Sequence, residues 1–310
     1  MAIDFGAHYH PTEVFPSGTR LDDLNELLDG RINNLDALLK LYDGTDVDRV
    51  ALSQPYYMGG EDEAAVTRAN QQLVETAESE DVFPIASIPL LDSGEQSANL
   101  FRQAINNGCC AGALETRTRG IELTDEAVEP VFNVADQADV PIFVHPKLTS
   151  SLHPEALDDD YRLNSIFGRE AALASSISKV IHDGVFDRYE NLSLVFHHFG
   201  GNIASMLGRV HLQLESGRWE TQDTVKSFAD FEEQLRQRVY VDTSGFLGYE
   251  APLKSALEVF GPSQILFATD APFEPRTPEE VSDLLSTVRS NTTQDEFEMI
   301  TKTNAVELLQ

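Results

Sequence analysis

Six side chains able to bind a metal ion or move a proton stand in four short, widely separated stretches of this 310-residue sequence. They are His8 and His10 in "AHYHP", His145 in "FVHP", His197 and His198 in "VFHHFGG", and Asp270 in "FATDAPF". Imidazole and carboxylate groups are common ligands of Zn²⁺ and similar ions, and both act as general acids or bases. The set predicts metal-assisted chemistry, provided that the fold brings the four stretches together.

Each stretch comes at the end of a short apolar and β-branched run, the pattern of a buried strand. Eight such runs are predicted, at residues 2–8, 48–53, 82–87, 111–116, 140–145, 192–197, 238–243 and 264–269. Segments with apolar residues at helical spacing lie between them, as at 62–80, 125–138 and 168–189. Eight strands alternating with helices favour an α/β fold, a single (β/α)8 TIM barrel over residues 1–310. A doubly wound open sheet is the alternative.

A barrel would collect the candidate residues on one rim, because active sites of such barrels lie at the C-terminal ends of the strands. His8 and His10 share a face of the first predicted strand, since side chains alternate and Tyr9 takes the other face. The same alternation turns His197 away from a site that His198 faces, which predicts that His197 is a structural residue or supports the site from behind a ligand. Three imidazoles and a carboxylate at this rim suit Zn²⁺ with a position open for water.

Basic residues are scarce in this chain, which makes their positions informative. Four of them follow predicted strands at the same rim: Arg117, Arg119, Lys147 and Arg276. Lys147 begins the longest irregular region, 146–167, whose length suits an active-site loop. These side chains are candidates to bind a substrate carboxylate, arginine by two parallel hydrogen bonds. The alternative is that each neutralises a nearby acidic residue.

The charge of the chain is strongly negative, with 52 acidic residues against 22 basic ones and a formal net charge of −30. Such a field repels nucleic acids and anionic membranes, so we expect neither as a partner. No stretch is long and apolar enough to span a bilayer. Acidic residues dispersed along the whole chain favour adaptation to high salt, and an ordinary acidic enzyme is the alternative.

The two cysteines, Cys109 and Cys110, are adjacent in the sequence. Neighbouring cysteines seldom meet the geometry of a disulfide, so we expect reduced residues in packing roles. Reduced thiols, with no basic and apolar leader after Met1, predict a cytoplasmic protein.

Several longer stretches resemble the amidohydrolase superfamily, in the amidohydrolase-2 branch that includes aminocarboxymuconate-semialdehyde decarboxylase and γ-resorcylate-type decarboxylases. They are "AHYHP" (7–11), "VEPVFNVADQADVPIFVHP" (128–146), "GVFDRYENLSLVFHHFGG" (184–201), "VYVDTSG" (239–245), "GPSQILFATDAPFE" (261–274) and "TNAVELL" (303–309). The resemblance covers nearly the whole chain, and the order and spacing of these stretches make it specific.

The resemblance implies one divalent metal ion, zinc first and manganese as the alternative, with His8, His10, His145 and Asp270 as its ligands. It implies that His198 lies over the metal and transfers protons with Asp270, and that the protein is a homodimer. Two residues depart from the family pattern. Phe199 stands where these decarboxylases often carry glycine, and Ala271 where an aromatic residue often follows the aspartate. The resemblance to the family therefore does not identify the substrate of this protein.

The predicted function is metal-dependent, non-oxidative decarboxylation of a small unsaturated or aromatic carboxylic acid. The first alternative is hydrolysis of an amide, lactone or related bond, because the same ligands can activate a water to attack a carbonyl. The second alternative is a non-catalytic metal-binding protein. In either enzyme the partner is a small molecule, a carboxylate or a carbonyl compound.

Overall fold

The structure is a computed structural model that describes residues 1–77, 81–146, 157, 160–215, 217–218, 220 and 223–309. Eight parallel strands form one sheet. In sheet order they are β1 (Ala2–His8), β2 (Val47–Ser53), β3 (Val82–Ser87), β4 (Ala111–Glu115), β7 (Ile142–His145), β8 (Leu194–Phe196), β9 (Val239–Asp242) and β10 (Ile265–Leu266). The sheet order follows the chain order, as a β/α barrel requires.

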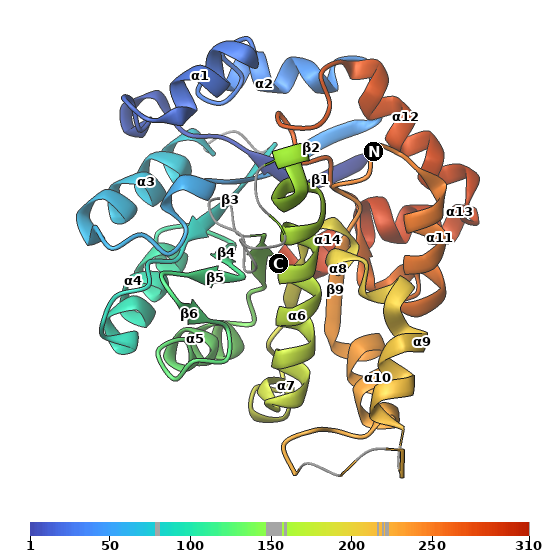
Figure 1. Cartoon of the computed structure of the whole chain (residues 1–310). Helices are drawn as coiled ribbons and strands as arrows, with labels where there is room; N and C mark the ends of the chain where they lie inside the picture. The colour runs from blue at the N-terminus through green and yellow to red at the C-terminus, as the bar shows by residue number, and fades with distance from the viewer. Residues whose placement is uncertain are drawn as a thin grey trace.

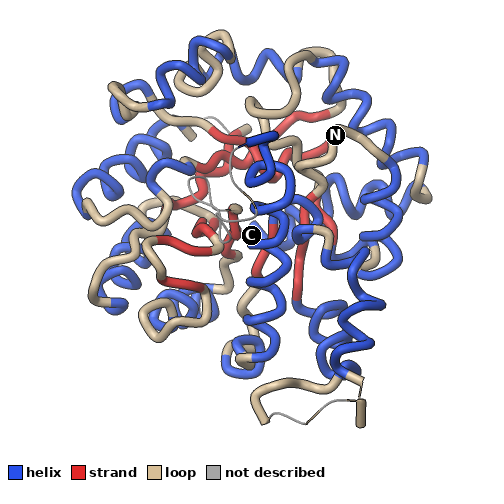
Figure 2. Tube along the Cα trace, viewed as in Figure 1, coloured by secondary structure: helices blue, strands red, loops and turns tan. Residues whose placement is uncertain are grey.

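The first and last strands meet at a seam where single backbone hydrogen bonds replace a continuous ladder. Phe5 N donates to Phe267 O at 2.9 Å, and His8 N donates to Ala271 O at 2.7 Å. The sheet is therefore a nearly closed barrel, with its strands gathered at the centre of the molecule in Figures 1 and 2. The predicted barrel is confirmed, and the open doubly wound sheet is wrong.

Helices surround the barrel (Figure 1). The longer ones are α3 (Glu63–Thr76), α4 (Gly94–Asn106), α5 (Glu129–Ala138), α6 (Arg169–His182), α9 (Ile203–Leu214), α10 (Phe228–Arg238), α11 (Glu250–Val259) and α12 (Pro278–Ser290). The shorter ones are α1 (Arg20–Leu27), α2 (Leu35–Leu39), α7 (Val185–Arg188), α13 (Gln294–Glu298) and α14 (Asn304–Leu309). Two short strands after β4, β5 (Arg117–Thr118) and β6 (Ile121–Glu122), form a hairpin. Among the helices that the structure describes, none has the length and apolar character needed to cross a bilayer.

Apolar side chains fill two shells, one inside the strands and one between the strands and the helices. Inside the barrel, the rings of Phe5 and Phe143 stack with their centroids 4.3 Å apart. In the outer shell, Phe101 of α4 and Phe132 of α5 are buried. Burial of each such ring contributes about 1.5–3 kcal/mol, so the strand ends rest on a well-packed core.

Helix α12 fixes the end of the loop that follows β10. Thr277 caps this helix, accepting a hydrogen bond from Glu280 N at 3.3 Å, while the Glu280 carboxylate accepts one from Thr277 N at 3.3 Å. This reciprocal capping box ties down two otherwise unpaired amides at the helix start. The chain between β10 and α12, which carries Asp270, is thus anchored at both ends.

Candidate metal centre and active site

His8, His145 and Asp270 come together at the C-terminal rim of the barrel. One donor atom from each lies within 4.8 Å of the others, and we call these three residues the ligand cluster. His8 Nε2 lies 2.8 Å from Asp270 Oδ1, and the rings of His8 and His145 have their centroids 5.1 Å apart. Two imidazoles and a carboxylate that converge in this way fit a divalent ion.

Asp270 reaches the cluster through an unusual backbone conformation at the seam. Its φ is 55°, in the left-handed region that costs a non-glycine residue energy. The buried carboxylate of Asp4 holds the preceding residue, accepting hydrogen bonds from Thr269 N at 3.1 Å and from Thr269 Oγ1. Thr269 Oγ1 also accepts from Ala271 N at 3.1 Å. Side chains at the seam therefore stabilise the turn that presents Asp270.

The two imidazoles of the ligand cluster are oriented through their other ring nitrogens. His145 Nδ1 donates to Pro146 O at 2.7 Å, which leaves Nε2 with its lone pair for a metal ion. His8 Nδ1 lies 2.9 Å from Ser53 Oγ. Burial, and then the neighbouring His197 and His8, hold the pKa of His145 well below its ordinary value. A neutral imidazole is the form that binds metal.

His10 is not part of this cluster. Its ring is buried, its Nε2 accepts a hydrogen bond from Tyr56 N at 3.4 Å, and its Nδ1 has no hydrogen-bond partner. Burial, and then the charge of His8, lower the pKa of His10 to about 3. The structure therefore brings together three of the four predicted ligands, and a ligand role for His10 remains a prediction.

His198 lies on the other side of Asp270, between two carboxylates. Its Nδ1 is 2.8 Å from Glu170 Oε1, and its Nε2 is 3.9 Å from Asp270 Oδ2. Burial opposes a charge on the ring, but the interactions with the Asp270 and Glu170 carboxylates outweigh it and hold the pKa of His198 well above its ordinary value. Since both ring nitrogens face carboxylates, the arrangement favours an imidazolium that can give up a proton.

Two acidic residues of the site escaped the sequence analysis. Glu170 lies on α6, and Glu274 lies on the loop after β10, where one of its oxygens is within 4.8 Å of donor atoms of His198 and Asp270. Glu274 accepts a hydrogen bond from Gly245 N at 3.0 Å. Burial, and then the charge of Asp270, raise the pKa of Glu274 to about 8. The position of Glu274, four residues after Asp270, was the one sequence feature that could have identified it. No sequence feature pointed to Glu170.

Gly245 is required at this point of the chain. Its φ is 92°, and a Cβ atom there would lie 2.6 Å from Cγ of His198. A side chain at this position would collide with the ring, so glycine permits the close approach of the loop after β9 to His198.

His197 does not point away from the site, so the prediction from strand alternation is wrong. β8 ends at Phe196, and the backbone then turns left-handed, with φ of 56° at His198 and 50° at Phe199. The His197 ring is buried, with its centroid 5.1 Å from that of His145. Side chains alternate between the two faces only while the backbone is extended. Here the extended backbone ends one residue before His197, so alternation does not set the direction of that ring.

Two of the four basic residues predicted at the rim are occupied by other protein groups. The guanidinium of Arg119 donates to Gly59 O at 2.6 Å and to Leu90 O, and it pairs with Glu61 at 2.8 Å, so it braces neighbouring loops. Arg117 lies 3.9 Å from the carboxylate of Glu122 on the hairpin. Both arrangements match the alternative of charge neutralisation.

For the other two basic residues, a substrate-binding role remains a prediction. Arg276 makes a long hydrogen bond of 3.5 Å to Pro272 O, on the loop that follows Asp270. Lys147 lies outside the described residues.

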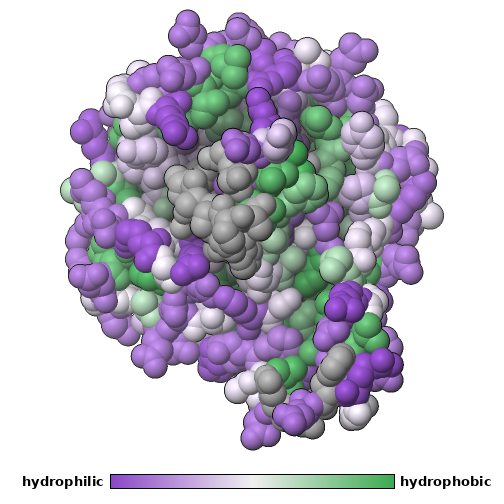
Figure 3. Space-filling view, in the orientation of Figure 1, coloured by the Kyte–Doolittle hydropathy of each residue, from purple (hydrophilic) through white to green (hydrophobic). Residues whose placement is uncertain are grey.

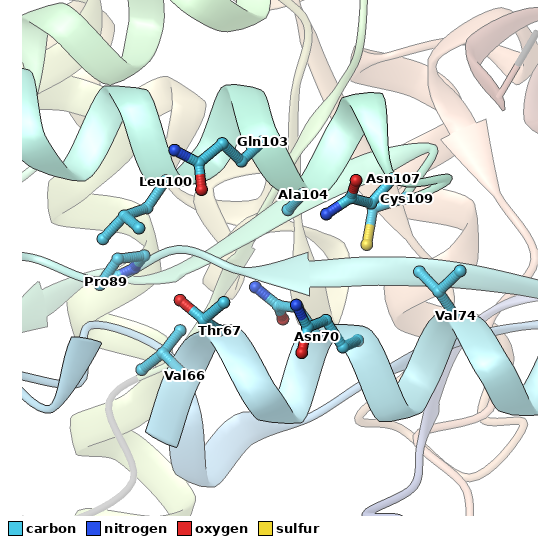
Figure 4. Close-up of a pocket in the computed structure, with 11 residues that line it drawn as sticks. Val66, Thr67, Asn70, Val74, Pro89, Leu100, Gln103, Ala104, Asn107 and Cys109 are labelled. Atoms are coloured by element: carbon cyan, nitrogen blue, oxygen red, sulfur yellow. The ribbon is translucent and has the colours of Figure 1, made fainter. Parts of the chain in front are cut away.

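The small pocket drawn in Figure 4 is separate from this site. It lies between α3 and α4 and is lined by residues such as Asn70, Gln103 and Cys109. Its volume of about 20 Å³ leaves room for little more than one water molecule. Burial raises the pKa of the Cys109 thiol to about 12, so this cysteine is an unreactive packing residue.

Comparison with known sequences agrees with this geometry. A sequence model of the amidohydrolase family, of the amidohydrolase-2 type, matches residues 3–310. The protein belongs to the amidohydrolase family. The predicted resemblance is thereby confirmed.

Individual relatives of this amidohydrolase are distant in sequence. A decarboxylase of Emericella nidulans, orsB, is 24% identical over 324 residues, which cover 98% of this chain and 95% of that protein. The γ-resorcylate decarboxylase of a Polaromonas species is 25% identical over 149 residues, 47% of this chain and 44% of that one.

The solved structures show the same fold. A dihydroxybenzoic acid decarboxylase from Polaromonas, solved with manganese and 2-nitroresorcinol, has a TM-score of 0.85 at 19% identity and covers 99% of this chain and 96% of its own. A 2,6-dihydroxybenzoate decarboxylase complexed with 2,6-dihydroxybenzoate has a TM-score of 0.84 at 20% identity, over 99% of this chain and 98% of that one.

Proposed function

We propose that this amidohydrolase is a metal-dependent carboxy-lyase that removes CO₂ without oxidation from a small aromatic carboxylic acid. One observation carries the proposal: His198, hydrogen-bonded to Glu170 at 2.8 Å, faces the Asp270 carboxylate of the ligand cluster. A proton donor beside a metal site is what protonation of a ring carbon needs. Three relatives, two of which match only part of this chain, are decarboxylases, which supports decarboxylation over hydrolysis.

The residues of this chain divide the work. A divalent ion bound to His8, His145 and Asp270 would supply positive charge for a substrate carboxylate and a neighbouring oxygen. As the carbon–carbon bond breaks, its electron pair stays on the ring carbon and the carboxylate leaves as CO₂. His198 Nε2 then donates its proton to that carbon. Glu170 stabilises the imidazolium before the transfer, and solvent restores the proton afterwards.

The same ligand set leaves hydrolysis as the competing proposal. In hydrolysis, Asp270 would have to accept a proton from water and pass it to a leaving group. In this structure both oxygens of Asp270 face imidazoles, His8 at 2.8 Å and His198 at 3.9 Å. These contacts, with burial opposing them, hold the pKa of Asp270 below its ordinary value, which makes it a weak base.

Several finer points belong to the same proposal. The donor set suits zinc, and the manganese in solved neighbours makes that ion the alternative to test beside it. We propose a single domain over residues 1–310, a homodimer, a cytoplasmic location and adaptation to high salt. Hydrophilic side chains predominate on the face drawn in Figure 3, in keeping with the acidic composition.

The test is a substrate screen on protein loaded with Zn²⁺ or Mn²⁺. Hydroxybenzoates, including 2,6-dihydroxybenzoate and 5-carboxyvanillate, are incubated alongside lactones and amides, with detection of CO₂ and of the ring product. Equal amounts of CO₂ and decarboxylated arene support the proposal. A new acid with an alcohol or amine, and no CO₂, would establish hydrolysis instead. Bound metal without turnover in any class would support the non-catalytic alternative.

A further inference from the structure

His198 lies on a short left-handed turn, residues 198–202, that follows β8. The φ angles of these five residues run from 50° at Phe199 to 67° at Gly200. Glycine and asparagine adopt this conformation readily, but a residue as bulky as phenylalanine seldom does. The backbone at Phe199 is therefore strained, and the surroundings of its side chain must hold it there.

Helix α6 explains a glycine of this turn, but it does not explain the phenylalanine. A Cβ atom at Gly201 would lie 2.8 Å from Cβ of Leu173 on α6. The helix therefore packs directly on the backbone of the turn, and this packing brings Glu170 within 2.8 Å of His198 Nδ1. The close approach requires a small residue at 201, whereas Phe199 needs a separate account.

The ring of Phe199 packs on the loop that follows β9. It is buried, and its centroid lies 5.6 Å from that of the Phe246 ring, with 43° between the planes. Phe246 directly follows Gly245, whose backbone is so close to His198 that a Cβ atom there would lie 2.6 Å from Cγ of the imidazole. The Phe199–Phe246 pair thus joins the two loops at the point where Gly245 meets the imidazole.

The outer helices hold this pair in place. With Leu253 of α11 and Leu284 of α12, the two rings line a cavity of only about 20 Å³. A space of this size holds little more than one water molecule, so neither ring can move far without displacing a helix.

Polar contacts fix the backbone around the imidazole. His198 N donates to Asp242 Oδ1 at 3.1 Å, and Gly245 N donates to Glu274 Oε2 at 3.0 Å. These bonds fix one amide on each loop. The contact between the rings of Phe199 and Phe246 adds the side-chain link between the loops.

We propose that the Phe199–Phe246 pair positions the His198 imidazole for proton transfer by holding the loop after β9 against it. This inference rests on the proposed function, in which His198 gives a proton to the substrate carbon. Both phenylalanines act through His198 and are positioning residues. A misplacement of about 1 Å can lower a rate by roughly 100-fold, so loss of the pair should lower turnover more than substrate affinity.

The first test removes the outer ring. In Phe246→Ala we expect kcat to fall by about 10-fold or more, with KM changed by less than threefold and metal content unchanged. Phe246→Tyr keeps the ring and should retain at least half of the native kcat. The matched control is Tyr189→Ala, because Tyr189 is also half-buried and packs on a buried ring, that of Phe132 at 6.0 Å, shortly before β8 begins.

This control should lower the Tm by a similar amount and leave kcat within about twofold of the native value. A kcat in Phe246→Ala within twofold of the native value, or an equal loss in Tyr189→Ala, overturns the inference.

Phe199→Gly separates the effect of the ring from that of the backbone. Glycine suits a φ of 50° better than phenylalanine does, so the turn should form at least as readily in this variant. We nevertheless expect kcat to fall as in Phe246→Ala, and to fall no further when the two substitutions are combined. A native kcat in Phe199→Gly, or losses that multiply in the double variant, would contradict the proposed pair.

Crystal structures of the native protein and of Phe246→Ala test the positioning without any assay. We expect the distance from His198 Nδ1 to Glu170 Oε1, 2.8 Å here, to exceed 3.5 Å in the variant, or the ring to take two orientations. An imidazole in the native position refutes the inference, whatever the activity. A native protein that releases CO₂ from no acid refutes the proposed function, and the crystal structures then still decide whether the pair positions the ring.

Discussion

The site has a ligand side and a proton side, and Asp270 stands between them. On the ligand side, His145 is buried and its Nδ1 donates to a backbone carbonyl rather than to a carboxylate. The ring is therefore neutral, and its pKa lies well below the ordinary value. On the proton side, Glu170 at 2.8 Å helps keep His198 charged, its pKa well above that value. The same residue type, buried in both places, is thus kept neutral, the form that binds a metal ion, in one place and charged in the other. The partner of Nδ1, a carbonyl for His145 and a carboxylate for His198, accounts for the difference in charge.

The largest expected effect comes from removing a ligand. Native protein should hold about one divalent ion per chain, and His8→Ala or His145→Ala should lose it, with decarboxylation reduced by about 10³-fold or more. Metal analysis after dialysis and turnover assays measure both effects. His211→Ala is the control, because His211 is exposed on α9 and stacks on Phe228. Full metal occupancy in both ligand variants would show that the ligand side has been misassigned.

Removal of the proton carrier should have a smaller and different effect. His198→Ala should retain the metal ion and the fold, while turnover falls by about 10²–10⁴-fold, the usual contribution of general acid–base help. Metal content, circular dichroism and turnover are measured on the same sample. Loss of the ion in this variant would mean that the two sides are not distinct.

The partner of His198 offers a sharper test through pH. A group whose pKa is raised in the folded protein keeps its proton until the pH rises through that value, so activity that needs the imidazolium should fall on the alkaline side. In Glu170→Gln one of the two carboxylates that raise this pKa is gone while Asp270 stays, so the alkaline limb of kcat should move to lower pH, with kcat near neutrality reduced by about 10-fold. An alkaline limb that stays in place in Glu170→Gln would show that Glu170 does not set the protonation of His198.

The smallest effect separates the buried site from the acidic surface. Salt screens exposed charges strongly and buried pairs weakly, and the chain carries a formal net charge of −30. The Tm should rise by about 5 °C or more from dilute buffer to molar salt, while the pH limb of kcat moves little. Calorimetry and pH-rate profiles at several salt concentrations test this. A Tm independent of salt would remove the high-salt adaptation and leave the enzyme assignment intact.

Strand ends were the part of the site that the sequence could predict. His8 and His145 terminate regular apolar runs, so the barrel alone fixes the rim on which they lie, and Asp270 follows the last run closely. The eight strands were also recognisable, because apolar runs separated by helical periodicity have few other arrangements.

The residues that sequence analysis misplaced lie where the backbone leaves a regular conformation. Left-handed φ values at His198 and Phe199 cannot be read from residue types that normally avoid them, so the direction of His197 was predicted wrongly. Glu170 is at the N-terminal end of α6, and only the packing of that helix over the rim brings it to His198. Contacts of this kind depend on tertiary structure and leave no local pattern.

The seam between β1 and β10 also sets an order of events during biosynthesis. His8 and Asp270 are 262 residues apart, so at ribosomal rates of 5–20 residues per second Asp270 emerges on the order of 10 to 50 s after His8. Throughout that interval the outer edge of β1 lacks the chain that will cover it, and His8 has no carboxylate beside it. A nascent chain therefore cannot assemble the complete ligand cluster before Asp270 has emerged.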